Sequence, residues 1–107
     1  MKKTFFTMLI ALLATLTASA AGDTTAGKAT YNKYCKSCHG TDGQHNPNIA
    51  KVMKVEMKDL GSSDVQSMSD ADLKKPITDG MGKMKPIKSI SGVDLDNVIA
   101  YIRTFKK

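Results

Sequence analysis

Cys35 and Cys38 are the two cysteines of the 107-residue chain, and His39 follows them directly. Residues three apart lie on the same side of a helical turn, so both thiols can reach one edge of a flat partner. A Cys-x-x-Cys-His run is the signature of covalent haem attachment, in which each thiol adds to one vinyl group of the porphyrin. The imidazole of His39 would then bind the iron on one face of the ring. The sequence therefore predicts one c-type haem, held by Cys35 and Cys38, with its iron bound by His39.

Three other kinds of site use cysteines at this spacing. A thioredoxin-like redox pair lies on a scaffold of alternating strands and helices, and the chain has no convincing strand pattern. A structural zinc ion needs four ligands, whereas Cys35, Cys38, His39 and His45 crowd into eleven residues with no second pair downstream. A plain disulfide is the usual state of cysteines in an exported protein, but it leaves the histidine without a role. Haem attachment uses all three residues of the motif.

The iron position opposite His39 needs a second ligand in an electron carrier, and methionine suits that role. Met84 is the preferred candidate because residues 78–86 contain glycines and a proline, which indicate an irregular loop. Met84 follows His39 by 45 residues, which is enough chain to reach the other face of a flat cofactor. Met81 is the alternative on the same loop. Four further candidates are expected to fill the core or to lie in loops: Met53, Met57, Met68 and His45.

The first twenty residues have the order of a secretory signal. Lys2 and Lys3 form a basic start, residues 5–16 are nearly all apolar, and Ala18 and Ala20 are the small residues that a signal peptidase recognises. A retained membrane anchor is the alternative, but the apolar run is shorter than the about 20 residues that cross a bilayer. We therefore expect residues 1–20 to be a signal peptide and residues 21–107 to be one domain, exported to the periplasm.

The 87 residues that remain after cleavage are near the lower limit for a core built from side chains alone. They contain no tryptophan, so a cofactor would supply much of the apolar interior. Removal of Lys2 and Lys3 lowers the net charge from +6 to +4, which indicates either a mildly basic solvated surface or a preference for acidic protein partners. The chain has no dense basic run or RNA-binding aromatic motif, which argues against nucleic acid as a partner.

The elements around the motif are predicted to be helical. The first helix begins at Asp23 or Thr24 and ends just after the first cysteine. Its Gly27 is a poor helix former and indicates close contact with another backbone. A loop at residues 40–48 is rich in Gly, Asn and Asp, and a short helix at residues 49–57 follows it. That helix has an apolar stripe made by Ile49, Val52 and Met53.

Two further helices are predicted in the second half of the chain. One has Ser69 as its cap and ends at Gly80, and its Pro76 predicts a kinked or two-part helix. The other covers residues 92–105, with Ser91 as its cap. The apolar residues at helical spacing are Leu73 and Ile77 in the former, and Leu95, Val98, Ile99, Ile102 and Phe105 in the latter.

These features together resemble class I cytochromes c, in particular small bacterial ones with a single haem. The resemblance covers residues 25–105 and implies an all-α fold of several short helices around one covalent haem, with crossing N- and C-terminal helices. It also implies His39 and Met84 as the two iron ligands. Four segments carry it in order: residues 27–31 (GKATY), 35–40 (CKSCHG), 80–84 (GMGKM) and 98–103 (VIAYIR).

The resemblance further implies two contacts within the protein. In the family a small residue on the first helix meets an aromatic residue on the last, and here these would be Gly27, with Tyr31 nearby, and Tyr101. The family also places a proline soon after the attachment site, and its carbonyl accepts a hydrogen bond from the proximal histidine. Pro47 matches by position, and such a bond would fix the tautomer of His39.

The chain departs from the family pattern at two prolines. Many members have proline directly after the axial methionine, whereas here Lys85 stands between Met84 and Pro86. This insertion keeps Met81 open as the alternative ligand. Pro76 lies where relatives usually continue a helix.

The function implied by the resemblance is one-electron transfer between periplasmic or membrane redox proteins, with no enzymatic activity. The protein is expected to be a monomer without stable membrane insertion, and its partners to present acidic docking surfaces. One alternative is a haem enzyme or gas-binding sensor with a labile methionine ligand. The other is a haem-free helical module closed by a disulfide. Four lysines are expected to surround an exposed haem edge: Lys36, Lys83, Lys85 and Lys88.

Overall fold

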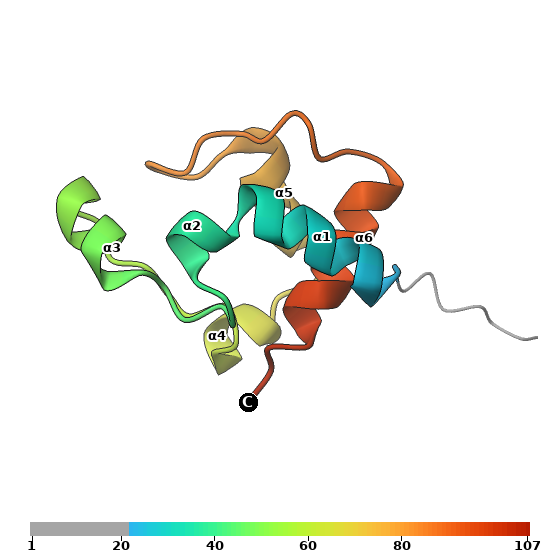
Figure 1. Cartoon of the computed structure of the whole chain (residues 1–107), viewed down its shortest axis with the longest axis horizontal. Helices are drawn as coiled ribbons and strands as arrows, with labels where there is room; N and C mark the ends of the chain where they lie inside the picture. Colours follow the sequence, from blue (N-terminus) through green and yellow to red (C-terminus); the bar gives the residue numbers. More distant parts are fainter. Residues whose placement is uncertain (1–21) are drawn as a thin grey trace, which may run out of the picture.

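The computed structural model describes residues 22–107, whose regular secondary structure is entirely helical (Figure 1). This confirms the all-α prediction, while the predicted signal peptide at residues 1–20 lies outside the described residues. Within residues 22–107, no helix has the length and apolar character needed to cross a membrane. The helices are, in order, α1 (Thr24–Tyr34), α2 (Lys36–His39), α3 (Pro47–Met53), α4 (Ser63–Gln66), α5 (Asp70–Asp79) and α6 (Val93–Arg103).

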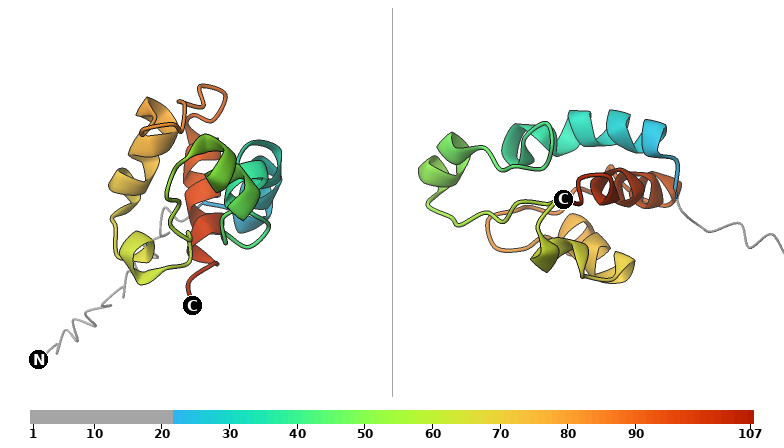
Figure 2. Two further views of the ribbon diagram at one scale, coloured as in Figure 1. Left: turned by 90° about the vertical axis from the view of Figure 1, so that its left-hand side faces the viewer. Right: turned by 90° about the horizontal axis from the view of Figure 1, so that it is seen from below.

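The first and last helices, α1 and α6, pack against each other and form the centre of the fold (Figures 1 and 2). Gly27 of α1 makes this possible, because a methyl group there would overlap the carbonyl oxygen of Asn97 and stand 3.0 Å from Cβ of Tyr101. The buried Asn97 side chain accepts a hydrogen bond from the backbone N–H of Asp23 at 2.8 Å. The predicted close backbone contact at Gly27 is therefore confirmed, and Asn97 is the main partner, with Tyr101 beside it.

An aromatic cluster joins the same two helices. The rings of Tyr31, Tyr101 and Phe105 meet edge to face, with centroids 5.0 to 5.3 Å apart. Such T-shaped pairs are more favourable than face-to-face stacking. Tyr31 is fully buried. The rest of the buried core cluster is Cys35, Ile77, Ile90, Val98, Ile99 and Ile102.

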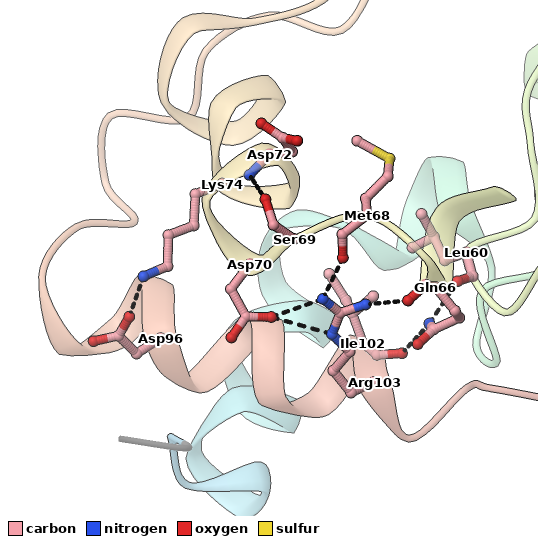
Figure 3. A network of polar contacts seen from close by, with 10 residues as sticks. All are labelled: Leu60, Gln66, Met68, Ser69, Asp70, Asp72, Lys74, Asp96, Ile102 and Arg103. Carbon is pink, nitrogen blue, oxygen red and sulfur yellow. Dashed lines mark hydrogen bonds and ion pairs between the residues drawn. The ribbon is translucent and has the colours of Figure 1, made fainter. Parts of the chain in front are cut away.

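Arg103, in the last turn of α6, fastens the segment between α4 and α5 to the core (Figure 3). Its guanidinium group donates to the carbonyl oxygens of Gln66 at 2.8 Å and Met68 at 2.6 Å, and to a carboxylate oxygen of Asp70 at 2.7 Å. The side chain of Gln66 in turn donates to the carbonyl of Ile102 at 3.0 Å. The bonds from Arg103 satisfy the backbone carbonyls of Gln66 and Met68.

Helix α5 is one continuous helix from Asp70 to Asp79, with Pro76 inside it and Gly80 as its C-cap. The predicted end at Gly80 is confirmed, and of the two predicted forms, kinked or two-part, the two-part form is wrong. Ser69 caps it as predicted, since its side chain accepts from the N–H of Asp72 at 3.1 Å. Pro76 lies in the last turns, where the missing N–H costs one intrahelical bond without ending the helix. Ile77 is buried and Leu73 packs beside it, as the apolar spacing predicted.

Helix α6 begins one residue later than predicted and ends two residues earlier. Its N-cap is Gly92, with φ of 56°, and no side chain caps it, so the predicted capping by Ser91 is wrong. The backbone carbonyl of Ser91 accepts from Asp94 instead, at 3.2 Å. A residue in this left-handed conformation is usually glycine, which explains the choice of cap.

Helix α3 stands apart from the other helices (Figures 1 and 2), and none of its residues is buried. It begins at Pro47 and ends at Met53, where Lys54 takes a left-handed conformation, so the predicted helix at residues 49–57 was placed too late. Proline suits a first helical position, because its missing N–H would have no partner there. The side chain of Val52 is 78% exposed, so the apolar stripe does not pack into the protein core as a unit.

Candidate functional site

The Cys-x-x-Cys-His motif forms a single helical turn directly after α1. Cys35 ends α1, with its N–H bonded to the carbonyl of Tyr31 at 2.8 Å, and its own carbonyl accepts from the N–H groups of Cys38 at 3.3 Å and His39 at 2.9 Å. Residues three apart on such a turn share one face. The structure therefore provides the local geometry that the spacing of the motif predicted.

The two thiols differ in their surroundings. Cys35 belongs to the buried core cluster, whereas Cys38 is half-buried, and neither is in a disulfide. Burial, and to a smaller extent the neighbouring Cys38, raises the pKa of the Cys35 thiol to about 11. A thiol with so high a pKa is uncharged at neutral pH, which disfavours a thioredoxin-type nucleophile at this position.

His39 presents a buried nitrogen without a protein partner. Its Nδ1 atom forms no hydrogen bond with any described residue, although it is shielded from solvent. Burial lowers the pKa of His39, and the nearby His45 lowers it further, so the imidazole is neutral at neutral pH. A neutral imidazole carries the lone pair that a metal ion needs. The predicted hydrogen bond from the His39 ring to the carbonyl of Pro47 is not formed, since Nδ1 has no protein partner.

A second set of bonds fixes the turn that follows the motif. The buried hydroxyl of Tyr31 donates to the carbonyl of Gly40 at 2.6 Å, and the N–H of Asn46 donates to the carbonyl of Cys38 at 2.9 Å. Gly40 has φ of 79°, a conformation that side chains disfavour. Burial raises the pKa of Tyr31, which keeps the phenol protonated and able to donate.

The methionine loop lies between α5 and α6 and contains a tight reverse turn. Met81 and Met84 exchange two backbone hydrogen bonds of 2.9 Å, with Gly82 at the first central position and φ of 55°. Glycine is preferred there because the turn requires a positive φ. The N–H of Ile87 then donates to the carbonyl of Ile77 at 2.8 Å, which returns the loop to α5.

The two methionines of this turn are differently exposed. Met84 is half-buried and packs against the core cluster that contains Cys35, whereas the side chain of Met81 is 60% exposed. Met84 is therefore the methionine of the loop that the fold directs toward the interior. The other methionines of the domain, Met53, Met57 and Met68, are half-buried on other segments.

The side chain of His45 contacts Asp59. Its Nδ1 atom lies 2.9 Å from Oδ1 of Asp59, and its backbone N–H donates to the same oxygen at 3.2 Å. The side-chain hydrogen bond from His45 holds the pKa of Asp59 below its usual range. Residues 22–107 contain no group of three or more His, Cys, Asp or Glu side chains placed to hold a metal ion.

Comparison with known proteins supports the haem interpretation. A family model described as cytochrome c oxidase, cbb3-type, subunit III matches residues 22–102. The chain belongs to this family of c-type cytochromes. Cytochrome c-554(547) of Halothiobacillus neapolitanus is 35% identical over 94 residues, which cover 80% of this chain and all of that protein. The solved structure of the KustC0563 c-type cytochrome is similar with a TM-score of 0.64 and 25% identity, over 76% of this chain and 98% of that one.

The protein is thus a small monohaem cytochrome c, a haem-based electron carrier with covalently bound haem c and iron. The predicted family, fold and cofactor are confirmed. The residues of this cytochrome fit such a group: two free thiols three residues apart, and a half-buried neutral imidazole directly after them. The loop with Met84 adds a thioether on the same apolar cluster as Cys35.

Exposed lysines flank both parts of the site. Lys36 lies inside the motif, and Lys83 and Lys85 lie on either side of Met84. None of these three forms an ion pair with the described residues. Lys88, the fourth predicted lysine, donates to the carbonyl of Thr78 at 3.1 Å and so also stabilises the methionine loop.

Two polar residues that position the site were not identified from the sequence. Asp59 closes the segment around α3 by accepting from His45, although 14 residues separate the two. Asn97 joins α6 to the start of α1 from within an apolar helix face. A polar residue inside an apolar stripe marks a position of interest, but its partner depends on tertiary packing.

Proposed function

We propose that this cytochrome is an exported one-electron carrier in which Cys35 and Cys38 hold the haem through thioethers, and His39 and Met84 bind its iron. The observation that carries the proposal is the helical turn at residues 35–39, which places two free thiols three residues apart and a neutral imidazole directly after them. The buried Nδ1 of His39 has no partner among the described residues. An unpaired buried polar atom costs about 1–3 kcal/mol, so we expect this nitrogen to gain a hydrogen-bond acceptor when the haem is bound.

When bound, the haem would supply a single iron that can cycle between its ferrous and ferric states. The chain would supply the two iron ligands, His39 and Met84. His39 is held by the helical turn, and Met84 by the paired backbone of its reverse turn. Because the backbone holds both ligands in place, the iron can keep the same two ligands in its oxidised and reduced states. Electron transfer then requires no protein group to move a proton or bind a substrate. The site therefore suits electron transfer and not enzymatic chemistry.

The periplasm is the proposed location, with residues 1–20 removed as a signal peptide. Gly22, which follows the proposed cleavage site by two residues, packs against α6, since a Cβ there would stand 2.5 Å from the backbone of Asp96 and Asn97. This contact supports residues 21–107 as the mature domain. N-terminal sequencing of the exported protein tests the boundary, and a first residue before Ala18 would contradict it.

We propose redox proteins with acidic docking surfaces as partners. Lys36, Lys83 and Lys85 are exposed near the motif and the methionine loop, so they are available to an acidic surface. Electrostatic steering of this kind raises the association rate and weakens as ionic strength increases. Stopped-flow electron-transfer rates with an acidic partner should fall with added salt, and rates that ignore ionic strength would remove this part of the proposal.

Optical spectra test the ligand assignment. Oxidised protein at neutral pH should show the weak far-red band of methionine sulfur on ferric haem, and reduced protein should resist carbon monoxide. A haem enzyme or gas sensor requires an open iron position. Absence of the band together with ready binding of carbon monoxide would favour that alternative and contradict the carrier.

A further inference from the structure

We propose that Met81 is a reserve ligand, whose sulfur binds the iron whenever Met84 is displaced from it. This inference rests on the proposed function, in which Met84 is the resident ligand opposite His39. It assigns a role to an exposed side chain that the carrier mechanism leaves unused. The consequence for the protein is that loss of its first sulfur ligand does not open the iron to small molecules.

The pairing of the two methionines is the first observation. The N–H of Met81 donates to the carbonyl of Met84 at 2.9 Å, and the N–H of Met84 donates back over the same distance. Side chains of directly opposite residues in an antiparallel pair point to the same face, with Cβ atoms about 4.5–5.5 Å apart. The two thioethers therefore start from neighbouring positions on one face of the turn.

The freedom of Met81 is the second observation. Its side chain is 60% exposed, and it stands between Gly80 and Gly82, both with positive φ. A Cβ on Gly82 would meet no atom within 4 Å, so the tip of the turn is not packed against the rest of the protein. Methionine is also flexible, with three rotatable bonds before its methyl group. The side chain of Met81 can therefore change its conformation without losing contacts to the buried core, of which it is not a part.

The neighbouring side chains are poorer substitutes. Lys83 and Lys85 are exposed on the same loop, but an ammonium group has no lone pair and would have to give up a proton before it could bind iron. His45 would have to give up its contact with Asp59. Met81 needs neither step, so it is the first sulfur or nitrogen group available when Met84 is absent.

The test compares haem-loaded wild type with Met84→Leu, Met81→Leu and the double variant. Leucine preserves the volume of methionine and cannot bind iron. We expect Met84→Leu to retain the far-red sulfur band, Met81→Leu to resemble wild type, and the double variant to lose the band. If Met81 holds the iron in about nine molecules of ten, Met84→Leu should bind carbon monoxide about tenfold more weakly than the double variant.

Each other outcome overturns the proposal in a recognisable way. Met84→Leu could lose the far-red band and bind carbon monoxide as tightly as the double variant does. That result would show that Met81 does not replace Met84, and it would leave the assignment of Met84 as the iron ligand intact. A low-spin spectrum without the band would show a lysine or histidine in that position. Loss of the band in Met81→Leu alone would overturn both assignments, because Met81 would then be the resident ligand. If Met84→Leu does not yield haem-loaded protein, Met84→Ala gives the same comparison.

Discussion

The core built on α1 and α6 and the segment of residues 44–59 around α3 are stabilised in different ways. The first buries aromatic and aliphatic side chains and is joined by the Asn97 and Arg103 hydrogen bonds. The second buries no residue of its helix and leaves Val52 largely exposed, and a hollow of about 490 Å³ lies against it. Side chains alone therefore account for one part of the fold and not for the other.

The difference indicates where the cofactor matters for stability. Apolar side chains without a protein partner do not stabilise a fold, because stabilisation requires their removal from water. The α3 segment has several such side chains that are only partly covered, among them Ile49, Met53, Val55 and Met57. We infer that the haem supplies the missing apolar surface there.

Prevention of haem attachment should have the largest effect. A variant with Cys35→Ala and Cys38→Ala should be mostly unfolded, because a domain of this size is marginal without its cofactor. Far-UV circular dichroism should show a large loss of helix, and proton NMR spectra should lose their dispersion. A haem-free variant with well-dispersed spectra would show that the protein core suffices. Any helix that persists should belong to α1 and α6.

A side chain at Gly27 should strongly destabilise the core. In Gly27→Ala the new methyl group would overlap the backbone of Asn97, which cannot move aside as a flexible side chain would. We expect a loss of about 2–3 kcal/mol in the free energy of unfolding of the haem-loaded protein, measured by denaturant titration. Ala29→Val, at an exposed position of the same helix, is the control and should cost only a few tenths. Equal effects of the two variants would contradict the close contact.

Removal of the Arg103 hydrogen bonds should destabilise the core built on α1 and α6 less than a side chain at Gly27 does. Arg103→Ala leaves the carbonyl groups of Gln66 and Met68 without their donors, which should cost about 1–2 kcal/mol in unfolding free energy. Arg103→Lys should recover only part of this, because an ammonium group cannot reproduce the planar fork. Lys75→Ala, which removes only an exposed ion pair with Asp72, is the control. A change as small as the control would show that water replaces these bonds.

The contact that closes the α3 segment should have the smallest effect, and it depends on pH. Asp59 has a lowered pKa in the folded protein, mainly because His45 donates to it. Its contribution is thus fully present above the usual pKa of about 3.8 and is lost as the pH falls through the lower folded value. The stability difference between wild type and Asp59→Asn should shrink in acid. A difference independent of pH would contradict the contact.

The parts that the sequence predicted correctly are those set by local chemistry. The motif turn, the cap of α5 at Ser69 and the apolar face of α6 depend on residues close together in the chain. The cap of α6 was missed because Ser91 and Gly92 are both plausible caps, and only tertiary placement decides between them. The bounds of α3 were missed because its apolar stripe has no protein face to meet. The partner of His45 is 14 residues away, beyond the reach of local patterns.

The mass and colour of the exported protein test the central claim, a haem tethered beside His39, most directly. The account predicts a coloured protein whose mass exceeds that of the mature polypeptide by one haem, with the added mass on the peptide that contains Cys35 and Cys38. It further predicts that the mass persists after acid and organic extraction, since thioether bonds are covalent. A colourless protein with the mass of the polypeptide alone would contradict it.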